Sequence, residues 1–360
     1  MELTTNKTEL AKALANIAGA ISPRTTLPIL GNVLIQANGS ELKMTSTDLD
    51  LILTVAIKAD VKTEGECTLP AKRLSSVIRE MPTESVSIKW NDSKAEIKSG
   101  DSRVKLIGLE SGEFPTSDAP VDRIAQFSID CELLESIIRR TQHSASIDES
   151  RYVLNGILIE STGDGLLFIA TDGRRLAKVD LPMDGCPPFT AIIPNKTVAL
   201  IHRTMTSGKC AIEIYPGQAA FTANGSSIRS KLIEGNFPNW RQVIPGYTGE
   251  TAKIEREALL AAVKRVGLMA DEKTNSVKFA LTENQVTISV NSQNIGEATE
   301  SIDCQCSITM TTSMNPHFVT QLLSGLKCDM VSLSILDDLS PIVFLDESFQ
   351  SVIMPMRAAN

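Results

Sequence analysis

The chain has 360 residues, and at roughly 100–200 residues per domain this length predicts two or three domains. Hydrophobic residues make up 42% of the chain and charged residues 22%, a balance typical of globular proteins that leaves little room for long disordered segments. The formal net charge of −8 excludes a chain that is basic throughout, so any surface for nucleic acid must be local.

The N-terminal stretch, MELTTNKTELAKALANIAGAI, lacks the basic region followed by an apolar region of a secretory signal. No run of about 18 apolar residues occurs that could cross a membrane as a helix. We therefore expect a soluble cytoplasmic protein.

The chain contains an internal repeat with three copies. Three stretches share a helical pattern, and their first glutamates, Glu9, Glu132 and Glu257, stand 123 and 125 residues apart. We expect each glutamate in the first helical turn, where the helix dipole favours an acid. The stretches are TELAKALANIAGAIS from Thr8, CELLESIIRRTQHSAS from Cys131 and REALLAAVKRVGLMA from Arg256.

A second helical series repeats with nearly the same spacing. Pro70 and Pro194 are 124 residues apart, and Asn315 follows 121 residues later at the same distance ahead of an amphipathic pattern. Proline suits a helix start because the first amides have no partner within the helix. The stretches are LPAKRLSSVIREM from Leu69, IPNKTVALIHRTM from Ile193 and MNPHFVTQLLSGL from Met314.

Strand-like runs separated by turn signals, such as Asn38-Gly39, fill the remainder of each copy. Copies one and two close on SGEFP (111–115) and EGNFP (234–238), which are 123 residues apart. The pattern predicts an α+β fold of three similar units. Their expected bounds are 1–122, 123–250 and 251–360.

The stretch IATDGRRLAKVDL (169–181) divides into a repeated part and a unique part. Thr171 and Asp172 have counterparts in Thr47 and Asp48, 124 residues earlier, so the Thr-Asp corner belongs to the shared fold. The Gly-Arg-Arg that follows is Leu-Asp-Leu in the first copy and has no counterpart in the third. The basic turn is therefore specific to the second unit.

Positive charge is concentrated on the predicted helices, although the whole chain is acidic. Lysine-rich and arginine-rich faces are often simply solvated, but the same bias on equivalent helices of a repeat also indicates a surface that faces phosphates. Both interpretations stay open for single helices. Cations on these helix faces include Lys12, Lys72, Arg139, Arg140, Arg203, Lys264 and Arg265.

Five motifs, in this order and spacing, give the chain a resemblance to the bacterial DNA polymerase III β subunits, the sliding clamps, over essentially its whole length. The motifs are RTTLPILGNVLI from Arg24, RYVLNGILIE from Arg151, ATDGRRLA from Ala170, GNFPNWRQVIP from Gly235 and VIMPMR from Val352. The resemblance implies three repeated DNA-clamp domains per chain. It also implies two chains that close head to tail into a ring, with helices lining the hole and antiparallel sheets outside.

The function implied by the resemblance is that of a processivity factor, which encircles duplex DNA and tethers a polymerase. Topology holds the DNA, so basic helices need only a diffuse attraction to phosphates, which permits sliding. The implied DNA contacts are Arg24, Arg73, Tyr152 and Lys196. The implied dimer contacts are Val104 and Leu106 on one side, with Leu268 and Met269 on the other.

The resemblance also implies a groove in which DNA polymerases, the clamp loader and repair proteins each insert a short peptide with apolar and aromatic ends. Leucine, valine and proline suit an apolar floor, and methionines can adapt to different peptides. One wall is expected from Arg151, Leu154, Thr171, Gly173, Arg174, Arg175, Leu176, Pro238 and Val243. The other is expected from Asn315, Phe318, Pro341, Val352, Ile353, Met354, Pro355, Met356 and Arg357.

Two positions depart from the usual family pattern. Arg174 stands where many members have histidine, and it adds a permanent charge at the groove. Val153 follows Tyr152 where many members have a second aromatic residue, which removes a surface on which bases could stack.

Other classes of function are weaker hypotheses. The histidines His143, His202 and His317 lie in no catalytic motif, and no Walker-type loop occurs, so we expect neither an enzyme nor a cofactor. An open repeat scaffold that binds protein partners without encircling DNA is the alternative. The cysteines predict buried free thiols rather than a metal site, because no second Cys or His pair completes a tetrahedral set: Cys67, Cys131, Cys186, Cys210, Cys304, Cys306 and Cys328.

Overall fold

The computed structural model describes residues 1–21, 27–115, 120–246, 252–271, 274–293 and 295–356. The chain divides into two compact units. Unit 1 comprises Met1–Glu135 and Lys196–Leu232, and unit 2 comprises Ser136–Asn195 and Ile233–Asn360. The second sequence copy is shared between these units, and the three sequence-based domain boundaries stay predictions.

Unit 1 contains two sheets with antiparallel pairing. The strands of the five-stranded sheet are, in order, β5 (Asp60–Thr63), β1 (Glu2–Asn6), β7 (Ser85–Asn91), β8 (Lys94–Ser99) and β9 (Ser102–Ile107). The strands of the eight-stranded sheet are β10 (Ala125–Asp130), β15 (Lys209–Tyr215), β16 (Gln218–Ala223), β17 (Ser226–Lys231), β4 (Leu51–Lys58), β3 (Glu41–Thr47), β2 (Asn32–Asn38) and β6 (Gly65–Pro70).

Unit 2 contains one antiparallel sheet of twelve strands within the described residues. The first four are β14 (Phe189–Pro194), β11 (Gly156–Ser161), β12 (Gly165–Thr171) and β13 (Arg175–Pro182). The other eight are β25 (Phe349–Ile353), β24 (Ile342–Asp346), β23 (Met330–Ser334), β18 (Ala252–Glu255), β21 (Gly296–Cys306), β20 (Gln285–Ser292), β19 (Val277–Thr282) and β22 (Met310–Met314).

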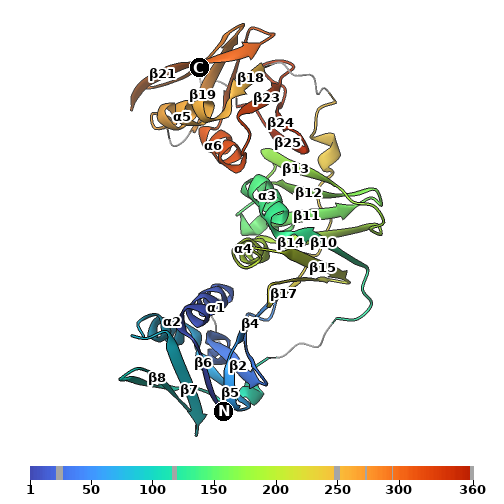
Figure 1. The fold of residues 1–360 in the computed structure, drawn as a ribbon. Helices are drawn as coiled ribbons and strands as arrows, with labels where there is room; N and C mark the ends of the chain where they lie inside the picture. The colour runs from blue at the N-terminus through green and yellow to red at the C-terminus, as the bar shows by residue number, and fades with distance from the viewer. Residues whose placement is uncertain (22–26, 116–119, 247–251, 272–273, 294, 357–360) are drawn as a thin grey trace. The chain divides into compact units, whose positions relative to one another are not determined.

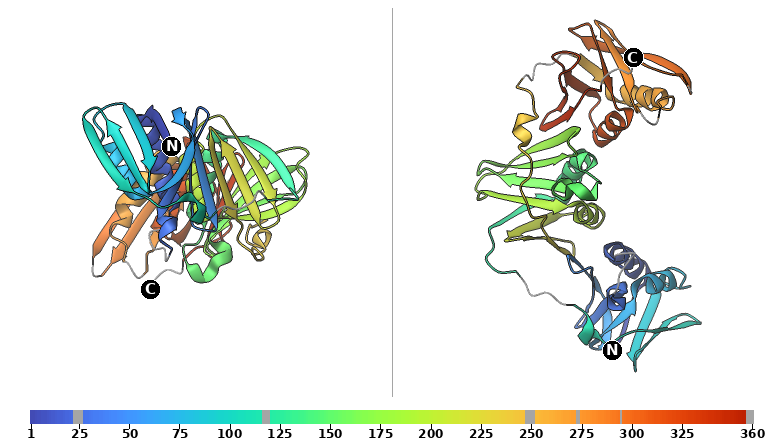
Figure 2. Two further views of the ribbon diagram at one scale, coloured as in Figure 1. Left: turned by 90° about the horizontal axis from the view of Figure 1, so that it is seen from below. Right: turned by 180° about the vertical axis from the view of Figure 1, so that it is seen from behind.

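Six α-helices occur in the described part of the chain, two for each sequence copy, which confirms the predicted α+β class. They are α1 (Lys7–Ala20), α2 (Ala71–Arg79), α3 (Cys131–Thr141), α4 (Asn195–Thr204), α5 (Arg256–Gly267) and α6 (Pro316–Gly325). Helix α1 lies beside α2, and α5 lies beside α6 (Figures 1 and 2).

The helix starts follow the predicted series with one shift. Glu132 and Glu257 are the second residues of their helices, but Glu9 is the third residue of α1, so the first glutamates of the copies are not strictly equivalent. Asn6 caps α1, because its side chain accepts from the Glu9 amide at 3.1 Å. Asn315 caps α6 in the same way, from the His317 amide at 2.9 Å.

Two seams join strands of successive copies. Strand β4 pairs with β17 inside unit 1, and β13 pairs with β25 inside unit 2 (Figure 1). The Lys231 amide donates to the Asp50 carbonyl at 2.8 Å, and the Met354 amide donates to the Arg174 carbonyl at 3.0 Å. The ladders share one register, because the pairs Val55↔Ser226 and Leu51↔Ser230 correspond to Val179↔Phe349 and Arg175↔Ile353.

None of the helices among the described residues is sufficiently long and apolar to cross a membrane.

Candidate functional site

The corner at residues 171–175 is a compact turn that ends β12 and begins β13. The Asp172 carboxylate accepts from the amides of Arg174 and Arg175 at 2.9 and 3.1 Å. The Thr171 hydroxyl donates to the Arg175 carbonyl at 2.6 Å and accepts from the Gly173 amide at 3.1 Å. Gly173 has a φ of 84°, a left-handed conformation that glycine adopts readily. The corner is thus held by its own side chains.

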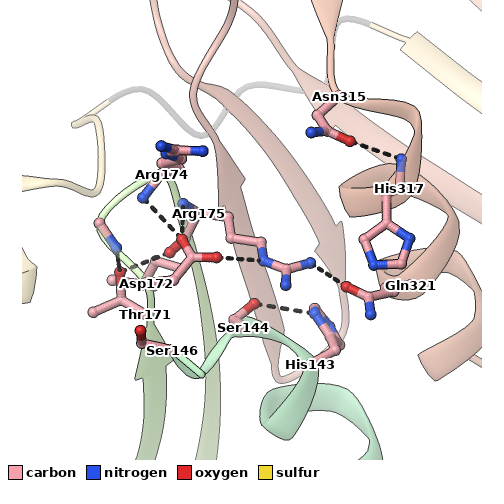
Figure 3. Close-up of polar contacts among 12 residues, drawn as sticks. His143, Ser144, Ser146, Thr171, Asp172, Arg174, Arg175, Asn315, His317 and Gln321 are labelled. Atoms are coloured by element: carbon pink, nitrogen blue, oxygen red, sulfur yellow. Dashed lines mark hydrogen bonds and ion pairs between the residues drawn. The ribbon is translucent and has the colours of Figure 1, made fainter. Parts of the chain in front are cut away.

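The Arg175 guanidinium ties this corner to α6. Only 8% of the residue is exposed, and its Nε donates to the Asp172 carboxylate at 3.0 Å (Figure 3). Its Nη1 donates to Gln321 Oε1 at 2.6 Å, and its guanidinium carbon lies 4.2 Å from the ring centroid of Phe318. Burial lowers the pKa of Arg175 and Asp172 opposes that shift, so the group remains a cation.

An open pocket of about 620 Å³ lies beside the corner. Four predicted groove residues line it: Arg151, Arg174, Arg175 and Phe318. Phe318 of α6, from the second predicted wall, therefore lines one pocket with three arginines of the first wall. The remaining lining residues are Gln142, His143, Ala145, Ser146, Ile147, Asp148, Asp172, Asn195, His317 and Gln321.

The C-terminal strand lies directly against the corner. Strand β25 pairs with β13, and the Met354 amide donates to the Arg174 carbonyl. The Met356 amide donates to the Ser313 carbonyl at 2.8 Å. Met354 is exposed, while Pro341, Pro355 and Met356 are partly buried. Arg357 lies outside the described residues.

Several predicted groove residues are buried beneath the surface. Leu176 and Val352 are 0% exposed and pack with Trp240 in a cluster that also contains Leu158, Ile169, Ile192 and Val343. Ile353 is likewise 0% exposed, and Leu154 and Thr171 are buried. These five residues do not line the pocket, and their contribution to a peptide groove stays a prediction. Pro238 and Val243 are exposed.

Sequence reasoning did not select His143, Gln321 or Asn195 as site residues. Burial, with a smaller contribution from the charge of Arg175, lowers the pKa of His143 to about 3. Its Nε2 and the Asn195 Oδ1 are buried, and neither has a hydrogen-bond partner within the described chain. Gln321 could have been found from helical spacing, because it lies one turn after Phe318 on α6.

The predicted DNA-contacting residues differ in their exposure and in their ion pairs. Arg73 is exposed on α2, and Tyr152 is 59% exposed on a 3₁₀ helix (Glu149–Leu154). Lys196 forms an ion pair with Asp48. Arg24 lies outside the described residues.

Other helix-face cations are also engaged inside their own unit. The Arg203 guanidinium donates to the Asn16 carbonyl at 2.7 Å, and Arg265 Nε donates to the Glu300 carboxylate at 2.9 Å. Arg139 donates to the Gly325 carbonyl. Part of the positive charge on the helices therefore has a structural role.

The predicted dimer residues lie at the surface. Leu268, which follows α5, is 78% exposed, and its neighbour Met269 is also exposed. Val104 and Leu106 are partly buried on β9, the edge strand of the five-stranded sheet. Leu268 therefore has no place in the core of its own domain.

The cysteines are free thiols, and all except Cys328 are buried. Burial raises the pKa of Cys67 and of Cys210 to about 12, which makes these two thiols poor nucleophiles.

Family models match three successive parts of the chain. They are the N-terminal, central and C-terminal domains of the DNA polymerase III beta subunit, at residues 1–118, 128–239 and 241–357. The beta sliding clamps of Salmonella typhimurium and Escherichia coli K12 are each 31% identical over 99% of this chain and 100% of their own length.

Solved structures agree with these matches. The clamp of Bartonella birtlesii superposes with a TM-score of 0.92 at 27% identity, and one from Pseudomonas aeruginosa with 0.93 at 28%. Each match covers 99% of this chain and 100% of the other. The predicted function, a DNA sliding clamp without a catalytic role, is the function of this family. The chain belongs to the DNA polymerase III beta subunit family, the beta sliding clamps.

Proposed function

We propose that two copies of this chain close into a ring around duplex DNA in the cytoplasm. In this proposal the pocket beside the 171–175 corner binds short peptides of polymerases, the clamp loader and repair proteins. The observation that supports the proposal is one pocket lined by the arginine corner and by Phe318 of α6. The paired strands β13 and β25 lie beside the corner, and the Met354 amide donates to the Arg174 carbonyl.

The chemistry of the pocket suits peptides. Phe318 offers an apolar contact there, and the guanidinium groups of Arg151 and Arg174 can donate to peptide carbonyls. Met354 and Val243 do not line the pocket, but both are exposed and can supply further apolar contacts. A solved clamp from Caulobacter crescentus, 28% identical, carries PEG at a proposed beta-motif tethering region.

The internal seams support a model for ring closure. Strand β9 of the first copy is equivalent to β17 of the second and β25 of the third. Unlike them, β9 lies at the edge of its sheet. Residues 296–303 of β21 occupy the place of β4 and β13, and in the described chain they pair only with β20. We expect β9 of one subunit to pair with this part of β21 in its partner subunit.

The shared seam register makes that model specific. It sets Val104 opposite Ala298 and Lys105 opposite Glu297 of the partner subunit. Opposite charges on facing strands favour this pairing. Leu268 and Met269 would then be covered by the partner subunit.

Ring closure is tested by loading the protein on nicked circular DNA and isolating the complex by gel filtration. We expect stable retention, and loss of the protein when the circle is cut once, because only topology holds the duplex. Equal retention on circular and linear DNA would favour the open scaffold.

The peptide site is tested by deleting residues 354–360. We expect loss of peptide binding with an unchanged dimer in sedimentation, because these residues follow β25 and are distant in sequence from β9 and β21. Peptide binding that survives the deletion refutes the assignment of the groove.

A further inference from the structure

Arg174 is a cation without a counter-ion. Its side chain is exposed, and its guanidinium makes no hydrogen bond or ion pair that the described part of the chain supplies (Figure 3). The nearest carboxylate in sequence, Asp172, is occupied by the amides of Arg174 and Arg175 and by the Arg175 guanidinium. The corner therefore holds the backbone of Arg174 and leaves its charge unpaired.

The charges around the pocket do not balance. Three guanidinium groups, those of Arg151, Arg174 and Arg175, line it together with two carboxylates. Asp172 pairs with Arg175 at 3.0 Å, and Asp148 lies 3.8 Å from Arg151. The excess positive charge therefore resides at Arg174.

The first seam shows how the chain neutralises a charge at this position. Asp50 is the counterpart of Arg174, and its carboxylate pairs with Lys231 at 2.8 Å. Lys231 and Met354 are equivalent, because their amides donate to the carbonyls of Asp50 and Arg174. The counter-ion position of the second seam thus carries a methionine, and the charge of Arg174 is available to a bound molecule.

We propose that Arg174 makes this groove select partner peptides that carry an aspartate or glutamate close to their apolar anchors. This inference rests on the proposed peptide-binding function. A guanidinium binds a carboxylate with two parallel hydrogen bonds, and the anchored backbone of Arg174 reduces the conformational freedom lost on binding. Because the pair is exposed to solvent, its effect is modest and depends on salt.

The experiment measures binding of fluorescein-labelled peptides to the full-length dimer by anisotropy. Each peptide is capped and has leucine and phenylalanine anchors. One aspartate is moved through the positions before and between the anchors, and each aspartate peptide has an asparagine twin. Binding is measured at 50 and 300 mM NaCl for the wild type, Arg174→Gln and Arg174→Glu.

At 50 mM NaCl we expect the wild type to prefer the best aspartate peptide over its asparagine twin by about two- to fivefold. Arg174→Gln should bind both twins equally, and Arg174→Glu should prefer asparagine. The preference of the wild type should shrink at 300 mM NaCl. Lys278→Gln is the matched control, because it removes an exposed cation of the same unit on β19 and should keep the aspartate preference.

The outcomes separate this inference from the function on which it rests. If every aspartate peptide and its twin bind the wild type equally, the role of Arg174 is wrong and the peptide groove stands. The role of Arg174 is equally wrong if the aspartate preference persists in Arg174→Gln. If the wild type binds none of the peptides, the proposed groove itself fails.

Discussion

The corners at residues 47–51 and 171–175 have the same backbone and different side chains. In the first corner the Asp48 carboxylate accepts from the amides of Asp50 and Leu51 at 3.1 and 2.8 Å, and the Leu49 amide donates to the Thr47 hydroxyl at 3.0 Å. The second corner makes each of these bonds at the equivalent atoms. The Thr-Asp pair therefore sets the turn, and the next three residues are free to differ.

The ion pairs that the corners form differ between the two seams. In the first seam Asp48 pairs with Lys196 of α4, and Asp50 pairs with Lys231, so the charges are satisfied within unit 1. In the second seam Asp172 pairs with Arg175 of its own corner, and Arg174 stays available. The aspartates of the first corner are thus paired with lysines of unit 1, whereas the second corner leaves the charge of Arg174 at the pocket.

Replacing Arg175 by the residue of the first corner, Arg175→Leu, should have the largest effect. It removes the partner of Asp172 and of Gln321 at a buried position, which should destabilise unit 2 by about 2–3 kcal/mol. Urea unfolding measures the loss, and faster amide exchange in α6 would locate it. Arg241→Leu is the control, since Arg241 is exposed beside Trp240 and should cost under about 1 kcal/mol. Equal losses for the two variants would contradict the role of Arg175.

His143, which lines the pocket of the second seam, should make the protein sensitive to acid. The folded protein keeps this histidine neutral because its pKa is lowered to about 3, whereas the unfolded chain binds the proton below about pH 6.5. Stability is therefore lost as the pH falls below 6.5. Between pH 7 and pH 5 the wild type should lose about 2 kcal/mol more than His143→Gln. Urea unfolding at both values tests this, and parallel losses in the two proteins would refute it.

The third position of each corner has a left-handed backbone, with φ of 79° at Leu49 and 84° at Gly173. Exchanging the residue types should have opposite effects. Gly173→Ala should destabilise the protein by about 1 kcal/mol, and Leu49→Gly should stabilise it by up to about 1 kcal/mol, because only glycine adopts this conformation without strain. Thermal unfolding measures both. Two shifts of the same sign would show that packing of the Leu49 side chain outweighs the strain.

The repeat made much of this comparison predictable from the sequence. The spacing of Thr47 and Thr171 identified both corners, and helical periodicity found the helices that follow. The contact of Arg175 with Gln321 joins residues 146 positions apart and depends on the β13–β25 pairing, which no local pattern encodes. The sequence alone could not show that Leu176 packs in a buried cluster, because apolar residues occur both in grooves and in cores.

Substitutions at the Lys196–Asp48 ion pair should change stability least. They also test whether Lys196 contacts DNA. Its ion pair with Asp48 is partly exposed, so Lys196→Gln and Asp48→Asn should each cost under about 1 kcal/mol. Their effects on DNA should differ. If Lys196 contacts a phosphate, Lys196→Gln removes that contact and should make retention on circular DNA less dependent on salt. Asp48→Asn frees the lysine and should strengthen retention at low salt. Equal retention curves for both variants would assign Lys196 to the first seam alone.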